Sequence, residues 1–255
     1  MPVAAGAEPV EDGERRRTVR DSLGVGVAVG VYGVAFGAAS VAAGFTPAQT
    51  SVSSLLTFTG GSQFAIAGVV AGGGSALAAL GSGYLLGARN TLYGLRLAAV
   101  LPTRGWRRWL AALLTIDEST AMALSQRRPA LARVAFWWTG SCIYLLWNLS
   151  TLLGAVGASA LGDPKRFGLD AAIPAAFLAL LIPQIKVRRA EQFSESKKLP
   201  ISDIRRSWLQ LSAAIPIALL AAVVALVLIP LTPPGVPVLA AGSALVLLAF
   251  GPAPT

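Results

Sequence analysis

Apolar residues dominate three long stretches of the chain, in which no Asp, Glu, Lys or Arg occurs. These stretches cover residues 22–88, 134–162 and 207–255. A transmembrane helix needs about 20 mostly apolar residues, and each stretch is longer than that. No core helix of a soluble protein requires such runs. The pattern therefore predicts an all-α, polytopic integral membrane protein.

Turn residues and isolated polar residues divide these stretches into about six to eight transmembrane helices. The expected spans are residues 23–43, 51–70, 76–101, 136–161, 169–185, 209–229 and 236–250. Segment 106–125 is shorter and contains two acids, so two topologies stay open. If it crosses the membrane, the chain has about eight spans; if it does not, one segment between residues 51 and 101 is re-entrant. We favour a broken or re-entrant helix near residues 58–64, because the polar motifs cluster in this part of the chain.

The charged residues lie mainly outside the apolar stretches and indicate the orientation. Residues 1–21 are expected to be a disordered cytoplasmic tail, and residues 22–255 a single transmembrane domain with a cytoplasmic loop at 186–206. Lys and Arg number four in the tail, six in residues 104–133 and seven in the loop. Cytoplasmic loops carry the excess of Lys and Arg, so both termini are expected in the cytoplasm. The arginines before the first span resemble a leader peptide, but that span is longer than a signal h-region and we interpret it as uncleaved.

The composition excludes several chemistries. Of the 255 residues, 55% are hydrophobic and 13% are charged, and histidine is absent. His-based acid–base catalysis and His metal sites are therefore impossible, and the single cysteine, Cys142, permits no internal disulfide or thiolate cluster. No Walker A motif occurs. The net charge of +9 is typical of loops that face anionic lipid, and we expect no nucleic-acid partner, no cofactor and no enzymatic activity.

The first candidate site is a glycine break inside the second apolar span. Gly60 and Gly61 are followed by two polar residues, Ser62 and Gln63. A helix that restarts inside the membrane presents free N–H groups and the positive end of its dipole, which suit a carboxylate. We therefore expect these four residues to bind substrate. The alternative is a tight helix crossing, with Gln63 bonded to a neighbour.

The second candidate site combines a cation with two acids. Arg89 and Tyr93 are four residues apart and share one helical face, with Asn90 beside them. Arg89 suits an anionic substrate group or a carboxylate partner, although it also suits a snorkelling position at the interface. Asp117 and Glu118 point about 100° apart, so one of them can face the interior, carry a proton, bind an ammonium group or pair with Arg89. Their alternative role is to start a helix.

Two further features predict packing between helices. Glycines four residues apart leave a flat stripe on the first span, on which another helix can approach closely; they are Gly26, Gly30, Gly33 and Gly37. Asn148, in the span at 136–161, is expected to bond a neighbouring helix. Cys142 is expected to be a small buried hydrophobe.

Four blocks in order along the chain resemble the AzlC-like large subunits of bacterial branched-chain amino-acid exporters. Residues 58–64 read FTGGSQF, where the family has F-A-G-A-S-Q-F, and residues 89–93 read RNTLY, similar to N-L-R-H-x-L-Y. Residues 115–119 read TIDES, similar to T-D-E-S/F, and residues 168–177 read GLDAAIPAAF, similar to G-L-D-F-A-x-P-A-x-F. The chain departs from the family at Asn90, where relatives have histidine, and Asn90 cannot carry protons.

The resemblance implies a secondary transporter subunit in the bacterial cytoplasmic membrane. It implies export of valine, leucine or isoleucine, driven by an ion gradient, with a small hydrophobic AzlD-type membrane subunit as partner. Proton coupling, if present, would then fall to Asp117 or Glu118. A permease or channel for another small solute, and a membrane scaffold that transports nothing, stay open as alternatives.

Overall fold

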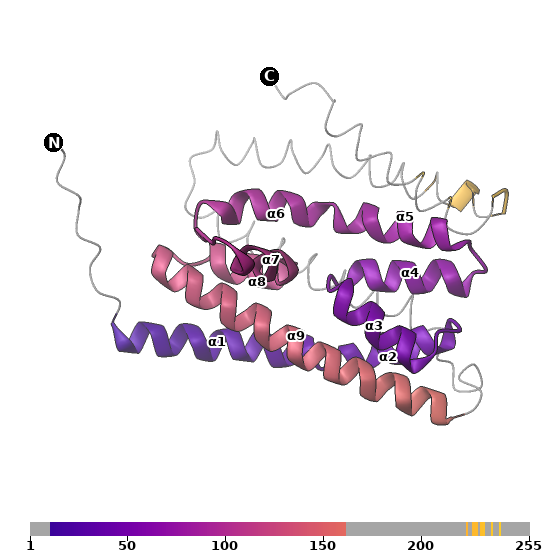
Figure 1. Cartoon of the computed structure of the whole chain (residues 1–255), viewed down its shortest axis with the longest axis horizontal. Helices are drawn as coiled ribbons and strands as arrows, with labels where there is room; N and C mark the ends of the chain where they lie inside the picture. Colours follow the sequence, from indigo (N-terminus) through magenta and orange to yellow (C-terminus); the bar gives the residue numbers. More distant parts are fainter. Residues whose placement is uncertain are drawn as a thin grey trace, which may run out of the picture. The chain divides into compact units, whose positions relative to one another are not determined.

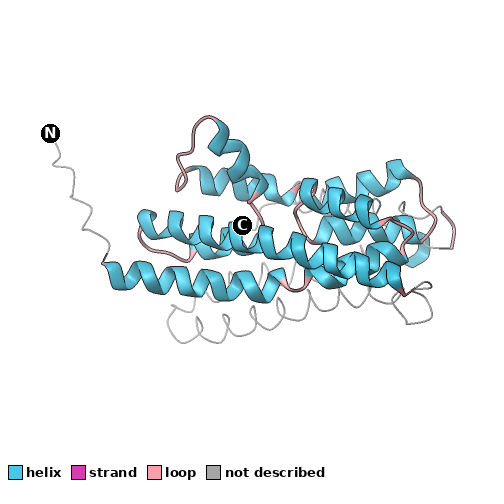
Figure 2. Cartoon of the chain, turned by 60° about the horizontal axis from the view of Figure 1, so that its bottom comes forward, coloured by secondary structure: helices cyan, strands magenta, loops and turns pink. Residues whose placement is uncertain are grey.

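The computed structural model describes residues 11–161 and a few short pieces further along, namely 223, 226–228, 230–232, 236 and 240. Residues 11–161 form nine helices and no strand, joined by short loops (Figure 2). The helices are α1 (Asp12–Gly30), α2 (Gly33–Ala42), α3 (Pro47–Leu56), α4 (Gly61–Ala71), α5 (Ala76–Gly87), α6 (Arg89–Ala98), α7 (Trp106–Leu113), α8 (Asp117–Leu124) and α9 (Pro129–Ala160). The predicted all-α class is confirmed for these residues.

The chain forms two compact units. Within the described residues, the first contains α1 to α3 and α6 to α9, and the second contains α4 and α5. The expected loop at 186–206 and the expected span at 169–185 lie outside the described residues. So do the spans expected at 209–229 and 236–250, apart from the short pieces named above.

Two helical stretches among the described residues are long and apolar enough to cross a membrane. They are Asp12–Ala42, which joins α1 and α2, and Pro129–Ala160, which is α9. At 1.5 Å per residue, the 32 residues of α9 extend about 48 Å, more than the roughly 30 Å of a hydrocarbon core. Both coincide with predicted spans, at 23–43 and 136–161. The total number of spans stays a prediction.

The glycine stripe on α1 and α2 is the surface against which α9 packs (Figure 1). Gly26 lies against Cys142, and Gly30 lies against Leu146. On α2, Gly33 and Gly37 lie directly against the backbone of α9 at Trp147 and Thr151, and the Thr151 hydroxyl donates to the Gly33 carbonyl at 3.3 Å. The interpretation of the stripe as a packing surface is therefore confirmed.

Helix α1 begins earlier than we predicted. Residues 12–20 belong to it, although we expected a disordered tail through residue 21. Two contacts explain the difference: Glu14 pairs with Arg128 at 2.9 Å, and the Thr18 hydroxyl donates to the Glu14 carbonyl at 2.9 Å. Asp12 and Glu14 also place negative charge in the first turn, where the helix dipole favours it. Residues 1–10 lie outside the described part of the chain.

The predicted interruption near residues 58–64 is present. Helix α3 ends at Leu56 and α4 begins at Gly61. Gly60 adopts φ 61° and ψ −83°, which a residue with a side chain rarely adopts. The end of α3 is held by α9, since the Tyr144 hydroxyl donates to the Leu55 carbonyl at 3.3 Å and the rings of Phe58 and Tyr144 meet edge to face at 5.0 Å.

Segment 106–125 forms a helical hairpin instead of one continuous helix. Helices α7 and α8 have eight residues each, about 12 Å at 1.5 Å per residue, and residues 114–116 join them. Before the hairpin, the Val100 carbonyl accepts a hydrogen bond from Nε of Arg133 at 3.3 Å. The stretch before the hairpin therefore lies beside the second turn of α9. Its turn lies against α9 at Gly140, which contacts Leu114.

Candidate functional site

An ion pair joins the first residues of two helices in the first unit. Nη2 of Arg89, which begins α6, lies 2.9 Å from Oδ2 of Asp117, which begins α8. The side chains are 41% and 32% exposed, so the pair is partly buried but still accessible. Asp117 fulfils both roles that the sequence left open, because it starts a helix and also binds the arginine.

The neighbouring residues make a second link between the same two elements. Nδ2 of Asn90 donates to the Thr115 carbonyl at 3.0 Å, while the Thr115 hydroxyl donates to the Ala111 carbonyl at 2.7 Å. Asn90, which replaces the family histidine, therefore has a defined contact with the hairpin turn. The amide positions the start of α6 beside Asp117.

The hairpin turn is closed by Ser119, a contact that the sequence analysis missed. The Ser119 hydroxyl accepts a hydrogen bond from the Ile116 amide at 3.1 Å and donates to the Leu114 carbonyl at 2.6 Å. Ser119 is fully buried. It satisfies backbone groups that the ends of α7 and α8 leave open and so fixes the position of Asp117. The signal in the sequence was a serine three residues after Ile116, in a segment too polar for a simple span.

The carboxylate of Asp117 has more than one neighbour. Oδ2 is engaged by Arg89, and the side chain of Tyr93 also interacts with the carboxylate. Oδ1 of Asp117 and the Thr120 hydroxyl one turn later are buried. The acid is therefore surrounded by polar groups of α6 and α8.

The remaining predicted residues lie around the pair. Tyr93, one turn after Arg89, is half-buried and close enough to Asp117 to interact with it electrostatically. Glu118 is also half-buried, in the first turn of α8. Arg96, which is not one of the predicted site residues, is exposed in the last turn of α6, away from the pair, where a cation complements the helix dipole. The structure therefore brings Arg89, Asn90, Tyr93 and the two acids together within the first unit.

The other predicted site residues lie in the second unit, at the start of α4. Gly61, Ser62 and Gln63 are buried, and Gly60 offers no side chain to cap the helix. The Ser62 hydroxyl is buried and makes no hydrogen bond in the structure. Gly83 of α5 packs against Ile66 of α4. The start of α4 is therefore a buried helix N-terminus directly after the glycine break.

One packing prediction needs correction. Asn148 was expected to bond a neighbouring helix, but its Nδ2 donates to the Tyr144 carbonyl of its own helix at 2.7 Å. Its Oδ1 is buried and makes no hydrogen bond in the structure. The amide competes locally for a carbonyl four residues earlier, which a sequence pattern does not distinguish from an interhelical bond. Among the described residues, no group of three or more His, Cys, Asp or Glu could hold a metal ion.

Comparison with known proteins identifies one family. The sequence model of the AzlC protein family matches residues 24–161, a little more than half of the chain. No curated protein and no solved structure shows a significant match. The AzlC family is associated with branched-chain amino-acid transport in membranes, is not a family of enzymes, and typically works with a partner membrane subunit.

Proposed function

Since the chain belongs to the AzlC family, we propose that it is the large subunit of a secondary transporter that exports branched-chain amino acids. Export would use an ion gradient across the bacterial cytoplasmic membrane and would require a small hydrophobic partner of the AzlD type. The observation that carries the proposal is the Arg89–Asp117 ion pair at the turn of the α7–α8 hairpin.

The position of this pair favours a functional role over a surface one. Leu114 contacts Gly140, seven residues along α9 from Arg133, which corresponds to a depth of about 10 Å below Arg133. Val100 lies at the level of Arg133, to which it is bonded. Arg89 precedes Val100 by eleven residues, which corresponds to about 16 Å of helix. If Arg133 lies at the membrane surface, the pair lies roughly one third to one half of the way into a 30 Å core. Ionisable residues at such depth are costly and usually functional.

The charges of the pair match those of a zwitterionic amino acid. A substrate carboxylate can replace Asp117 at the Arg89 guanidinium, while its ammonium group binds the Asp117 carboxylate. This exchange keeps every charge compensated, which a low-dielectric site requires. When substrate leaves, the ion pair closes again. Tyr93 is placed to donate a hydrogen bond to either carboxylate.

The two remaining groups of residues have supporting roles in this proposal. The start of α4, with Gly60, Gly61, Ser62 and Gln63, lies in the second unit and is proposed as an anion-binding element in its own right, through its N–H groups and positive dipole end. Asp117 and Glu118 are the candidates for proton coupling, since Asn90 cannot titrate.

We also propose a topology with six spans, in which the hairpin does not cross the membrane. The bond between Val100 and Arg133 and the cavity that Arg104, Arg107 and Arg133 line together support an arrangement in which these three arginines lie on one side of the membrane. The positive-inside rule assigns that side to the cytoplasm. The segments between residues 51 and 101 then contribute one net crossing, as the re-entrant alternative requires. Both termini are cytoplasmic in this arrangement.

The test is efflux of labelled valine from cells that are fed a valine-containing dipeptide, with this chain alone and with its small partner. Arg89→Gln and Asp117→Asn should reduce efflux at least tenfold at equal membrane abundance. Arg96→Gln, on the same helix, and Asp21→Asn, an exposed acid of α1, are the matched controls and should leave it unchanged.

The exchanged pair separates a substrate-binding role from a structural one. The double variant Arg89→Asp/Asp117→Arg preserves an ion pair but reverses the charges that the substrate meets, so it should remain inactive. Restored efflux in this variant would show that the pair serves only to hold the hairpin. Normal efflux in both single variants would refute the site, and absence of efflux in the wild type with and without its partner would refute the substrate class.

A further inference from the structure

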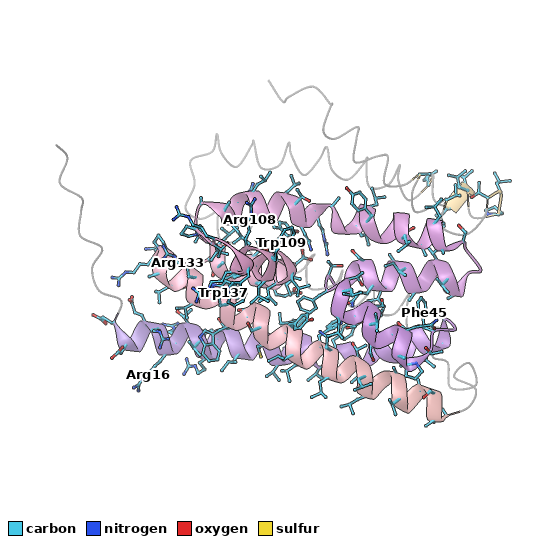
Figure 3. All side chains as sticks on the ribbon, viewed as in Figure 1. Arg16, Phe45, Arg108, Trp109, Arg133 and Trp137 are labelled. Atoms are coloured by element: carbon cyan, nitrogen blue, oxygen red, sulfur yellow. The ribbon has the colours of Figure 1, made fainter. Side chains whose placement is uncertain are left out.

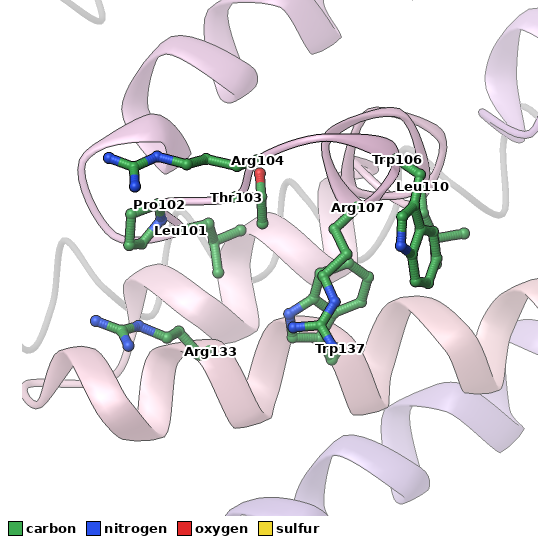
Figure 4. A pocket seen from close by; sticks show the side chains of 9 residues that line it. All are labelled: Leu101, Pro102, Thr103, Arg104, Trp106, Arg107, Leu110, Arg133 and Trp137. Atoms are coloured by element: carbon green, nitrogen blue, oxygen red, sulfur yellow. The ribbon is translucent and has the colours of Figure 1, made fainter.

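A cavity of about 680 Å³ lies between the first turn of α7 and the early turns of α9, within the first unit (Figure 4). Three arginines line it: Arg104, Arg107 and Arg133. The apolar part of its wall includes Leu110 and the indoles of Trp106 and Trp137. It involves none of the residues of the candidate transport site.

The cavity carries a positive charge that no acid of the described residues compensates. No Asp or Glu lines it, and no ion pair within the described residues involves its three guanidinium groups. Nε of Arg133 is bonded to the Val100 carbonyl at 3.3 Å, which fixes this side chain and leaves its terminal nitrogens to a ligand. Figure 4 shows Arg104 and Arg133 extending to the same side, while Arg107 reaches toward Trp137. Arginine side chains suit the oxygens of a phosphate group.

The surroundings place the cavity at a membrane surface. Trp106 and Trp109 on α7 are 70% and 80% exposed, and Figure 3 shows Trp109 and Arg108 on this short helix beside Arg133 and Trp137 of α9. Exposed tryptophans next to arginines are typical of the interface between hydrocarbon and water. Arg133 lies in the second turn of a helix long enough to cross the membrane, so the cavity opens where that helix enters the bilayer.

We propose that this cavity binds the phosphate headgroup of an anionic phospholipid. Arg104 and Arg133 contact the phosphate oxygens, and Trp106 and Trp137 contact the glycerol and the first acyl carbons. Arg107, which lies over the Trp106 ring at 5.9 Å, adds positive charge between these two parts of the cavity. An inorganic phosphate ion would need far less space and would gain nothing from the indole walls. Because the hairpin that holds Asp117 begins at this cavity, a bound lipid fixes the base of the hairpin against α9.

The experiment measures lipid binding to the purified full-length protein in detergent by native mass spectrometry. The probes are phosphatidylglycerol and phosphatidylcholine of identical acyl chains, with inorganic phosphate as competitor. The wild type should retain phosphatidylglycerol at least fivefold more strongly than phosphatidylcholine. Arg104→Gln/Arg133→Gln should weaken phosphatidylglycerol binding roughly tenfold. Arg15→Gln/Arg16→Gln removes the same charge from exposed positions of α1 (Figure 3) and should leave binding unchanged.

Three results would overturn the proposal. Equal losses in the two double variants would show that basic residues bind lipid without a specific cavity. Displacement of the lipid by millimolar inorganic phosphate would assign the cavity to the free anion. Equal retention of both lipids by the wild type would remove the headgroup specificity. If Arg104→Gln/Arg133→Gln does not elute as a folded protein, the single variant Arg107→Gln provides the same test, with a smaller expected loss of about threefold.

Discussion

The contact between α2 and α9 makes a sharp prediction about Gly37. A Cβ atom at this position would lie 2.7 Å from the Ala155 amide nitrogen and closer still to the Thr151 carbonyl oxygen. Both atoms belong to the backbone of α9, so no side-chain rotation can relieve the overlap. The variant Gly37→Ala therefore forces α2 and α9 apart and weakens the contacts on either side of the glycine.

The expected magnitude follows from two opposing terms. Replacement of a helical glycine by alanine stabilises a helix by up to about 1 kcal/mol. Overpacking of a close contact typically costs about 1–3 kcal/mol, and a clash with backbone lies at the upper end or beyond. We expect a net loss of about 1–2 kcal/mol, which corresponds to a midpoint of thermal unfolding lower by about 2–8 °C for a chain of this size.

The assay measures the midpoint of thermal unfolding in detergent. After heating to each temperature, the folded fraction is the part of the protein that still elutes as a single species in size-exclusion chromatography. Gly157→Ala is the matched control, because Gly157 lies in α9 and a Cβ there meets nothing within 4 Å. It should leave the midpoint unchanged or raise it. A Gly37→Ala midpoint equal to that of Gly157→Ala would refute the close approach of the two helices.

A double variant tests the shared cause. Gly154 of α9 lies against the Val34 backbone of α2, where a Cβ would be 2.9 Å from the Val34 carbonyl carbon. One separation of the helices relieves both overlaps, so the combined loss in Gly37→Ala/Gly154→Ala should be smaller than the sum of the single losses. Strictly additive losses would mean that the two glycines act at independent contacts, contrary to the geometry.

Three further changes probe other parts of the chain. Gly60→Ala should lower the free energy of unfolding by about 1–3 kcal/mol, because φ 61° strains any residue with a side chain. Gly24→Ala is the control, since a Cβ there meets nothing within 4 Å, and an equal thermal midpoint in the two variants would contradict this. Ser119→Ala should cost about 1–2 kcal/mol and reduce valine efflux, because it opens the hairpin turn, whereas Ser125→Ala, at an exposed position, should do neither. Glu14→Gln should accelerate hydrogen exchange at residues 12–20. The free energy of unfolding should change by less than about 1 kcal/mol, since the lost ion pair is half-exposed. Unchanged exchange would show that Arg128 does not hold the start of α1.

The local features of this fold could be predicted from sequence because each depends on a few neighbouring residues. The length of an apolar run predicted α9, and paired glycines predicted the break before α4. The capping of α3 is equally local: Thr46 and Gln49 bond reciprocally, at 2.9 and 3.2 Å, ahead of the first turn that Pro47 begins. These signals act over one or two helical turns, so no tertiary information is needed to interpret them.

The missed features depend on contacts between residues far apart in the chain. The start of α1 at Asp12 is held by Arg128, more than a hundred residues later. The division of segment 106–125 into two short helices depends on such contacts too, because an apolar count does not distinguish one helix from two and the turn between α7 and α8 packs against Gly140 of α9. Asn148 shows the reverse: a long-range bond was expected and a local one formed.

The candidate site combines both kinds of information, and this explains how far it could be predicted. The residue types at 89, 90, 93, 117 and 118 pointed to charge chemistry inside an apolar region, and an Arg89–Asp117 pair was among the alternatives. Only the structure selects that alternative, since the pair requires the hairpin turn to approach the start of α6. The same turn brings the Asp117 carboxylate beside Tyr93 as well, one helical turn after Arg89. A cation and a hydroxyl on one face of α6 therefore meet the acid that begins α8, and this meeting depends on the packing of α6 against the hairpin turn and not on the local sequence of either segment.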